Sequence, residues 1–197
     1  MKRIFDLILA LFGLLVLSPI FLLISFLIKL HDKGPVLFKQ IRIGKYGKPF
    51  FLYKFRSMGT NQSDYEGTFD PGNSEDITPI GRFLRKTKCD ELPQLVNVLK
   101  GEMSMVGPRP EVEKWVSLYP ERWKRILTLS PGITDNASIM FRIEESLLSG
   151  SEDPEKMYRE IILPKKLDLY EEYLSEHSLL GDLKLIWKTV VYIIYKK

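Results

Sequence analysis

The chain has 197 residues, of which 45% are hydrophobic, and a formal net charge of +4 at pH 7. This length suffices for one compact domain with a short appendage and hardly for two independent domains. The basic balance suits an anionic partner, and nucleic acid, a lipid headgroup layer and a small phosphate-bearing substrate all meet that description. A single cysteine, Cys89, excludes an internal disulfide and a cysteine-rich zinc site. The composition therefore favours a domain that faces the cytosol.

Residues 4–28 are almost wholly apolar and predict a membrane segment. A secretory signal peptide would have a shorter apolar core followed by a cleavage site of small residues, and no such site follows here. Basic residues flank the segment on both sides, with Lys2 and Arg3 before it and Lys29 and Lys33 after it. Because basic flanks stay in the cytoplasm, both ends of the segment are expected there.

Ser18 and Pro19 lie in the middle of this segment and predict a bend. Pro19 has no N–H, and its ring clashes with the carbonyl of Leu15. The Ser18 hydroxyl can donate to the carbonyl of Leu14 or Leu15, which lowers the cost of opening the backbone in lipid. Two forms satisfy this pattern, a re-entrant helix that returns to the side it entered from and an ordinary kinked spanning helix.

Residues 36–43 and 50–56 are short apolar and basic runs joined by a glycine-containing segment at 44–49, and they predict a β-hairpin. Lys54 and Arg56 fall on the same side of the second strand, where they could meet a phosphate or a headgroup layer. A solvated strand face explains the same alternation equally well.

Residues 61–79 are rich in polar residues, glycine and proline, and predict a surface loop. Apolar residues then recur at helical spacing and predict a helix over 91–100, with Gly101 at its C-terminal cap. Pro93 is acceptable only in the first turn, so the helix is expected to begin near Asp90.

Asp90 and Glu91 are therefore expected at a helix N-terminus, where free N–H groups and partial positive charge favour ionised carboxylates and attract phosphate. A carboxylate in this position could act as a nucleophile. A divalent cation, with Mg²⁺ preferred by carboxylate and phosphate oxygens, would relieve the repulsion between the two adjacent anions. An ordinary Asp cap followed by a first-turn Glu explains the pair without catalysis.

Arg109 stands between Pro108 and Pro110, which favour an extended backbone and would hold the guanidinium where it can grip a phosphate or a planar base. A rigid surface turn is the alternative. A Pro-Gly turn at residues 130–135 is interpreted as structural support.

The C-terminal region is expected to be helical over 158–176, with a break near Pro164, followed by an apolar segment over 182–195. Trp187, Tyr192 and Tyr195 are the residue types that gather at a membrane interface. The segment is short for a span of about 20 residues, so it is expected to lie against the membrane or to pack on the N-terminal helix. A buried core helix is the alternative.

Seven of these motifs occur in one order along essentially the whole chain, and together they resemble the bacterial sugar transferase family, the small monotopic phosphoglycosyl transferases. They are the segments at 2–6, 18–19, 34–40, 54–58, 90–95, 106–110 and 130–134. The resemblance implies an α+β fold, with a mostly helical cytosolic domain (34–197) that contains a small β-hairpin and an interfacial C-terminal helix. A kinked re-entrant membrane helix (1–33) would anchor it to the cytoplasmic face of the bacterial inner membrane.

The resemblance also implies a reaction in exopolysaccharide or related glycoconjugate synthesis. Asp90 would attack the β-phosphorus of a UDP-sugar, UMP would leave, and polyprenyl (undecaprenyl) phosphate would then take the sugar phosphate. Glu91 and Asp90 would hold Mg²⁺. Arg109 would bind the nucleotide, with weaker assignments of substrate contacts to Arg85 and Arg56, and to Lys54 from the strand pattern.

The expected partners are thus the UDP-sugar, the polyprenyl phosphate and membrane lipids, and no nucleic acid is expected. The oligomeric state is left open, and a homodimer is one of the possible states. Two other classes of function stay open. Cys89 could be the nucleophile of a membrane-bound thiol enzyme, although His31 and His177 lie in no recognisable partner motif. The chain could also be a non-catalytic scaffold that binds anionic lipid.

Overall fold

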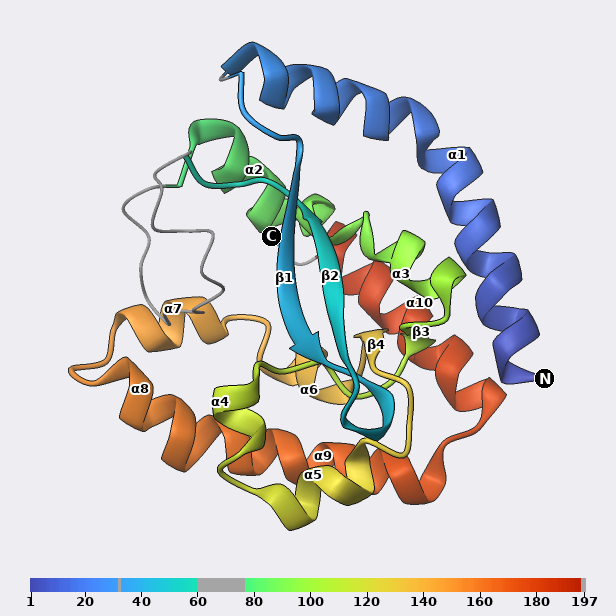
Figure 1. Ribbon diagram of the computed structural model, residues 1–197, viewed down its shortest axis with the longest axis vertical. Coiled ribbons are helices and arrows are strands. Elements are labelled where there is room, and N and C mark those ends of the chain that lie inside the picture. Colours follow the sequence, from blue (N-terminus) through green and yellow to red (C-terminus); the bar gives the residue numbers. More distant parts are fainter. Residues whose placement is uncertain (32, 60–76, 196–197) are drawn as a thin grey trace.

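The computed structural model describes residues 1–31, 33–59 and 77–195, and in this part of the chain helices predominate and two small two-stranded sheets are present (Figure 1). Helices and strands follow one another in the order α1 (Lys2–His31), β1 (Leu37–Ile43), η1 (Lys45–Gly47), β2 (Pro49–Phe55), α2 (Pro79–Thr87), η3 (Cys89–Glu91), α3 (Gln94–Lys100), β3 (Ser104–Val106), α4 (Glu113–Val116), α5 (Pro120–Ile126), β4 (Gly132–Thr134), α6 (Asn136–Met140), α7 (Glu144–Ser149), α8 (Pro154–Met157), η4 (Tyr158–Ile162), α9 (Leu163–Glu176) and α10 (Leu179–Tyr195). The prediction of a mostly helical chain with a small hairpin is confirmed.

By length and composition, α1 is the one helix of the described residues that could cross a membrane. Pro19 lies inside it, and the Ser18 hydroxyl donates to the Leu15 carbonyl at 2.8 Å, one of the two bonds that the sequence predicts. The course of α1 changes direction partway along its length (Figure 1). Its re-entrant placement in a membrane stays a prediction.

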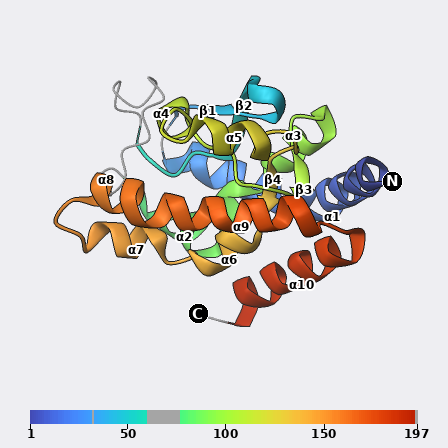
Figure 2. The same ribbon diagram turned by 90° about the horizontal axis from the view of Figure 1, so that it is seen from below.

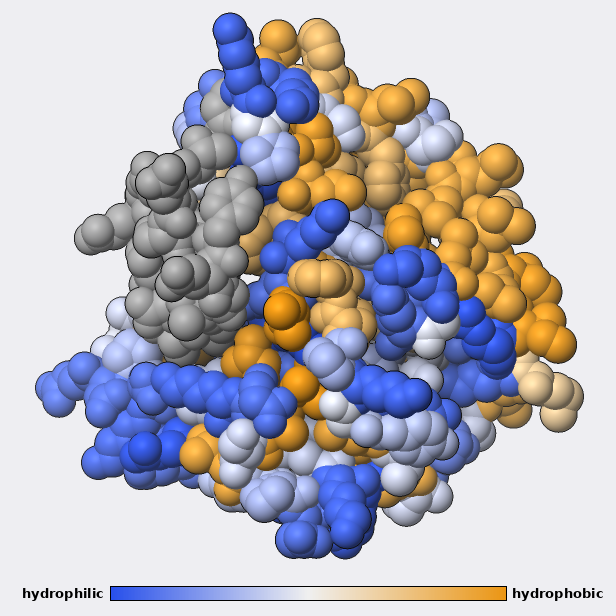
Figure 3. All heavy atoms as spheres, in the orientation of Figure 1, coloured by the Kyte–Doolittle hydropathy of each residue, from blue (hydrophilic) through white to orange (hydrophobic). Residues whose placement is uncertain are grey.

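One narrow face of α1 packs against α3 and β3. Ala10 is fully buried there, in a cluster with Leu95 and Val98, and a Cβ on Gly13 would lie only 3.2 Å from the Leu95 side chain. Small residues therefore let α1 approach the domain closely. The opposite side of the helix presents apolar side chains outward, which appear as the hydrophobic edge in Figure 3.

Polar contacts fix the first two turns of α1. The Arg3 guanidinium donates to the carbonyls of Val98 and Leu99, at 2.6 and 3.1 Å, and so caps the C-terminal end of α3. The buried Asp6 carboxylate accepts from the Ser104 hydroxyl at 2.9 Å and from the Met105 N–H at 3.1 Å. The start of α1 is thus built into the domain.

The hairpin forms as predicted, with β1 and β2 antiparallel, Leu37 opposite Phe55 and Ile43 opposite Pro49. Asn97, which is fully buried on α3, joins the helix to the hairpin. Its side chain accepts from the Tyr53 N–H at 3.1 Å and donates to the Phe51 carbonyl at 2.6 Å. The hairpin and α3 are therefore fixed to each other, and they support residues 89–91, which follow α2.

The helix predicted over 91–100 is shorter than expected. Lys88 adopts a left-handed conformation (φ 57°) and ends α2, after which residues 89–91 form a 3₁₀ turn and α3 begins only at Gln94. Pro93 is the N-cap of α3, because its missing N–H cannot continue an α-helix from the turn before it. Asp90 therefore lies inside the 3₁₀ turn, and the prediction that the helix begins near Asp90 is wrong. Gly101 (φ 88°) ends α3 as predicted.

The loop predicted over 61–79 lies outside the described residues up to 76, and its last residues differ from the prediction. Ile77 forms a β-bridge with Met58, and α2 begins at Pro79. The Thr78 hydroxyl caps α2 by accepting from the Gly81 N–H at 2.9 Å. A Thr-Pro pair at a helix start is a recognised signal, and it could have predicted α2.

The second half of the chain carries a large cluster of buried side chains, which includes Trp115, Trp123 and Tyr170 from α4, α5 and α9. The break predicted near Pro164 is a π-helical turn (η4) that leads directly into α9. After α9 the chain folds back into α10 (Figure 2), which packs on α6, β3 and β4. Its outer face exposes apolar residues: Leu180, Leu183, Trp187, Val190, Ile193 and Tyr195.

Candidate active site

Asp90 is the carboxylate that the structure leaves most free to react. Asp90 is 6% exposed, and its Oδ1 atom has no hydrogen-bond partner among the described residues. Burial raises the pKa of Asp90 above its usual value, the positive charge of Lys54 opposes that shift, and the neighbouring Glu91 adds to it. A buried carboxylate with an unsatisfied oxygen is costly to the fold, which is a common property of reactive groups.

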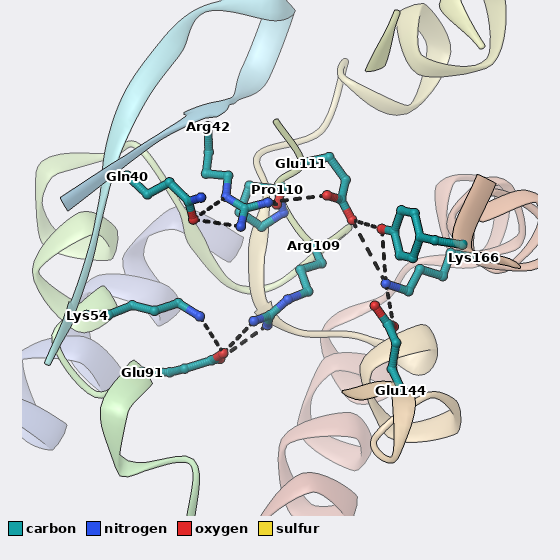
Figure 4. A network of polar contacts seen from close by, with 10 residues as sticks. Gln40, Arg42, Lys54, Glu91, Arg109, Pro110, Glu111, Glu144 and Lys166 are labelled. Carbon is teal, nitrogen blue, oxygen red and sulfur yellow. Dashed lines mark hydrogen bonds and ion pairs between the residues drawn. The ribbon is translucent and has the colours of Figure 1, made fainter. Parts of the chain in front are cut away.

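Glu91 lies beside it and is fully engaged (Figure 4). Arg109 holds the carboxylate with both ends of its guanidinium, and Nη1 donates to Oε2 at 3.2 Å while Nη2 donates to Oε1. The Lys54 ammonium donates to the same Oε1 at 3.0 Å. Burial alone would raise the pKa of Glu91, but Arg109 and Lys54 hold that pKa well below its usual range. Glu91 is therefore an anion that fixes two cations next to Asp90.

The structure thus brings together four residues predicted from the sequence: Lys54 from β2, Asp90 and Glu91 from the 3₁₀ turn, and Arg109 from the loop after β3. Burial lowers the pKa of Lys54, and the charge of Glu91 counteracts this effect. The charge of Glu91 raises the pKa of Arg109. Two held cations beside a buried carboxylate make a site that favours a polyanionic ligand such as a diphosphate.

The loop that carries Arg109 is fastened to the segment that the sequence marks as structural support. The Gly107 N–H donates to the Thr134 carbonyl at 3.1 Å, and the Gly132 N–H donates to the Pro108 carbonyl at 3.0 Å. The two strands approach so closely that a Cβ on Gly132 would lie 2.1 Å from the Gly107 nitrogen. Only glycine fits there, so both motifs shape one rigid loop that aims Arg109 at Glu91.

Glu111 continues the loop into a buried network that the sequence does not reveal (Figure 4). Its Oε2 atom accepts from Arg42 at 3.3 Å, and its Oε1 atom accepts from the Tyr158 hydroxyl. Arg42 also donates to the Pro110 carbonyl at 3.3 Å and, at 2.7 Å, to Gln40. The hairpin thereby holds the residue that follows Arg109.

On the other side of this network, the Lys166 ammonium on α9 donates to the Tyr158 hydroxyl at 3.3 Å and pairs with Glu144 at 2.6 Å. Lys166 is itself buried. Ion pairs of this kind cost desolvation and do little for net stability, but they fix geometry when every member is satisfied. The network therefore ties α7 and α9 to the loop of Arg109.

The structure places the other two predicted substrate contacts near Ser57. Arg85 donates from Nε to the Ser57 hydroxyl at 3.0 Å. Arg56 is buried and lines a small cavity with His31 and Thr78, close to the end of α1. The charges that act most strongly on Asp90 come instead from Lys54, Glu91, Lys88 and Arg109. The roles of Arg56 and Arg85 stay predictions.

The side chains fit a magnesium ion at Asp90 better than at Glu91. No group of three or more His, Cys, Asp or Glu residues in the described part of the chain could hold a metal. Mg²⁺ needs only one or two carboxylates when substrate phosphates and water complete its shell. The unpartnered Oδ1 atom of Asp90 fits that requirement, whereas both oxygens of Glu91 are engaged by cations.

Cys89 precedes the carboxylates and belongs to the packing of the domain. It is partly buried against the cluster of Ile24, Ile28, Phe55 and Leu84. This environment is that of a small apolar core residue and does not favour a thiolate nucleophile.

The fold and site define a helical domain with an apolar N-terminal helix and a carboxylate–cation centre suited to phosphate chemistry. A model of the bacterial sugar transferase family matches residues 1–196, and the chain belongs to this family. It is 40% identical over 190 residues to the "Uncharacterized sugar transferase EpsL" of Bacillus subtilis, covering 96% of this chain and 85% of that protein. It is 41% identical over 199 residues to the "Exopolysaccharide production protein PSS" of Rhizobium leguminosarum bv. phaseoli, covering 97% and 94%.

A longer relative carries a more specific name. The "UDP-glucose:undecaprenyl-phosphate glucose-1-phosphate transferase" of Escherichia coli is 38% identical over 198 residues, which cover 96% of this chain and 39% of that protein. This chain therefore spans less than half of that relative.

Proposed function

We propose that the protein transfers a sugar phosphate from a UDP-sugar to undecaprenyl phosphate at the cytoplasmic face of the bacterial inner membrane. The family and the names of its relatives support the class of reaction. The observation that carries the mechanism is the buried Asp90 carboxylate, which has an oxygen without a partner beside cations that Glu91 holds in place.

In the first step, an oxygen of Asp90 attacks the β-phosphorus of the UDP-sugar. The bond from that phosphorus to the bridging oxygen breaks, and UMP leaves with the bond's electrons. Asp90 then carries the sugar phosphate as an acyl phosphate. Arg109 and Lys54 offset the negative charge that gathers on the phosphates during this step.

In the second step, a phosphate oxygen of undecaprenyl phosphate attacks the same phosphorus. The bond to Asp90 breaks, which restores the carboxylate and yields an undecaprenyl diphosphate sugar. Mg²⁺, when bound with the donor, would reduce the repulsion between the phosphates and the carboxylates. Asp90 offers a ligand oxygen for it, and a contribution from Glu91 would require one of its cation contacts to open.

The apolar α1 helix would bring this chemistry close to the lipid substrate. Its exposed hydrophobic edge (Figure 3) supports contact with the membrane, and the basic residues at both of its ends favour a re-entrant helix with both ends in the cytoplasm. A homodimer is compatible with this arrangement.

A trapped intermediate tests the mechanism. Incubation with Mg²⁺ and each of a panel of UDP-sugars, without undecaprenyl phosphate, should release about one UMP per active site and add a sugar-phosphate mass to a peptide containing Asp90. Asp90→Asn should lose both the adduct and turnover while still folding. Glu91→Gln should weaken donor binding, because Arg109 and Lys54 lose the charge that holds them.

Wild-type protein that turns over with undecaprenyl phosphate but never releases UMP in its absence would contradict the covalent step. Direct attack by the lipid phosphate would then explain the reaction. Turnover by Asp90→Asn at the wild-type rate would remove Asp90 from the mechanism altogether.

A further inference from the structure

A cavity lies at the first turn of α1 and shares none of its lining residues with the Asp90 site. It encloses about 200 Å³, several times the roughly 30 Å³ that one water molecule occupies in the liquid. Five segments meet around it: the start of α1, the hairpin turn η1, β3 with the residue before it, the residues before β4, and the end of α9 with the connection to α10. We call this space the basal cavity, lined by Lys2, Arg3, Asp6, Lys45, Met103, Val106, Leu129, Ser130, Tyr173 and His177.

The charges around the basal cavity leave an excess of cations. Lys2 pairs with Asp182 outside the lining, and Asp6 keeps its negative charge because it accepts hydrogen bonds from the neutral Ser104 hydroxyl and Met105 N–H. Lys2, Arg3 and Lys45 thus stand against two carboxylates, which leaves one positive charge in excess. Arg3 contacts only neutral carbonyls, and the Lys45 ammonium lies 5.0 Å from the centre of the Tyr46 ring. Among the described residues, neither Arg3 nor Lys45 forms an ion pair with a carboxylate. An anion in the cavity would supply the missing charge.

The position of the cavity indicates which kind of anion would bind there. The Lys2–Asp182 pair joins the first turns of α1 and α10, so the two helices begin side by side there (Figure 1). Directly after this pair, both helices carry exposed apolar side chains, which are Ile4 and Ile8 on α1 and Leu183 on α10. A phospholipid has the same order of parts, with a phosphate at the surface and acyl chains beyond it.

We propose that the basal cavity binds the phosphate of an anionic phospholipid headgroup, while the acyl chains lie along the exposed residues of α1 and α10. This inference rests on the membrane association proposed above. The cavity is a site for a structural lipid, separate from the sites of the two substrates. Lys45 is the most suitable residue for a test, because it is exposed in the hairpin turn and caps no other element.

Native mass spectrometry of the full chain in neutral detergent, with added phosphatidylglycerol, provides the test. The wild type should retain one lipid, and Lys45→Ala should bind it about tenfold more weakly, as expected for the loss of one charge-assisted contact. Lys45→Arg should restore binding. Lys48→Ala is the matched control, since Lys48 is an exposed cation in the same turn and does not line the cavity.

Equal losses in Lys45→Ala and Lys48→Ala would overturn the proposal, because they would show only diffuse attraction of anionic lipid. Displacement of the lipid by inorganic phosphate at equal concentration would assign the cavity to a free anion. UMP release in detergent should be the same in Lys45→Ala and wild type. If Lys45→Ala abolished UMP release, the cavity would belong to the substrate site, and the lipid proposal would fail while the proposed reaction stood.

Discussion

At the scale of single residues, the raised pKa of Asp90 makes a prediction about stability. A carboxylate with a higher pKa in the folded state binds its proton more tightly there than in the unfolded chain. Folding stability should therefore fall as pH rises from the ordinary Asp range through the raised pKa. Asp90→Asn removes this effect, so the variant should gain stability over wild type across that interval and keep the gain at neutral pH. Thermal unfolding of both proteins at a series of pH values measures it.

Asp168→Asn supplies the control for that experiment, since the Asp168 side chain is 70% exposed. This variant should follow the wild-type pH dependence. An Asp90→Asn protein that is less stable than wild type at neutral pH would contradict the prediction, because it would show that the Asp90 charge stabilises the fold.

The network behind Arg109 makes a second prediction at this scale. Glu111→Gln leaves the buried Arg42 cation without its counter-charge, which should cost about 3–5 kcal/mol of folding free energy. Arg42→Gln combined with Glu111→Gln should cost less than the sum of the two single changes. Denaturant unfolding of the four proteins gives the coupling energy. Additive losses would show that Glu111 and Arg42 do not act as a pair.

Part of this site could be predicted from the sequence and part could not. Asp90 and Glu91 are adjacent in the chain, and Arg109 is framed by two prolines, so local patterns single them out. Glu111 has no such pattern: its partner Arg42 lies 69 residues away and Tyr158 lies 47 residues away. Only the folded chain brings these groups together.

At the scale of elements, the exposed apolar face of α10 leads to a prediction that this helix lies in the membrane interface. The chain has three tryptophans, of which Trp115 and Trp123 are buried and Trp187 on α10 is 69% exposed. If α10 lies in the interface, lipids with brominated acyl chains should quench the fluorescence of Trp187 and leave that of the other two nearly unchanged. Trp187→Phe should then show little quenching. Equal quenching in wild type and Trp187→Phe would contradict an interfacial α10.

The bounds of some elements can be predicted from the sequence and those of others cannot, and the difference lies in the local sequence pattern of each element. The hairpin is set by two apolar runs around a turn, and its strands form within a residue or two of the prediction. The start of α3 is wrong in the prediction because a 3₁₀ turn at residues 89–91 precedes Pro93, and that turn follows Lys88, which takes a left-handed conformation that lysine rarely adopts. The parallel pair of β3 and β4 has only three residues in each strand, too few for a periodic signal.

At the scale of the whole molecule, the charges on both sides of α1 predict its topology. Cysteines introduced at Lys2 and at Lys33, each in a Cys89→Ala background, should both react with a membrane-impermeant reagent added from the cytoplasmic side. Labelling in inside-out and right-side-out vesicles makes the comparison. Labelling of the two positions from opposite sides would reject the re-entrant helix and favour a spanning one.

The buried Asp6 also affects the order of events during synthesis. Its carboxylate receives hydrogen bonds from Ser104 and Met105, which lie 98 and 99 residues later in the chain. When α1 leaves the ribosome these partners do not yet exist, and an unsatisfied carboxylate is costly in a membrane. With α1 in the membrane as proposed, we expect the helix to insert at first only to a depth that leaves Asp6 in contact with water. It should reach its final depth only when β3 forms, so that the domain completes the insertion of the helix that anchors it.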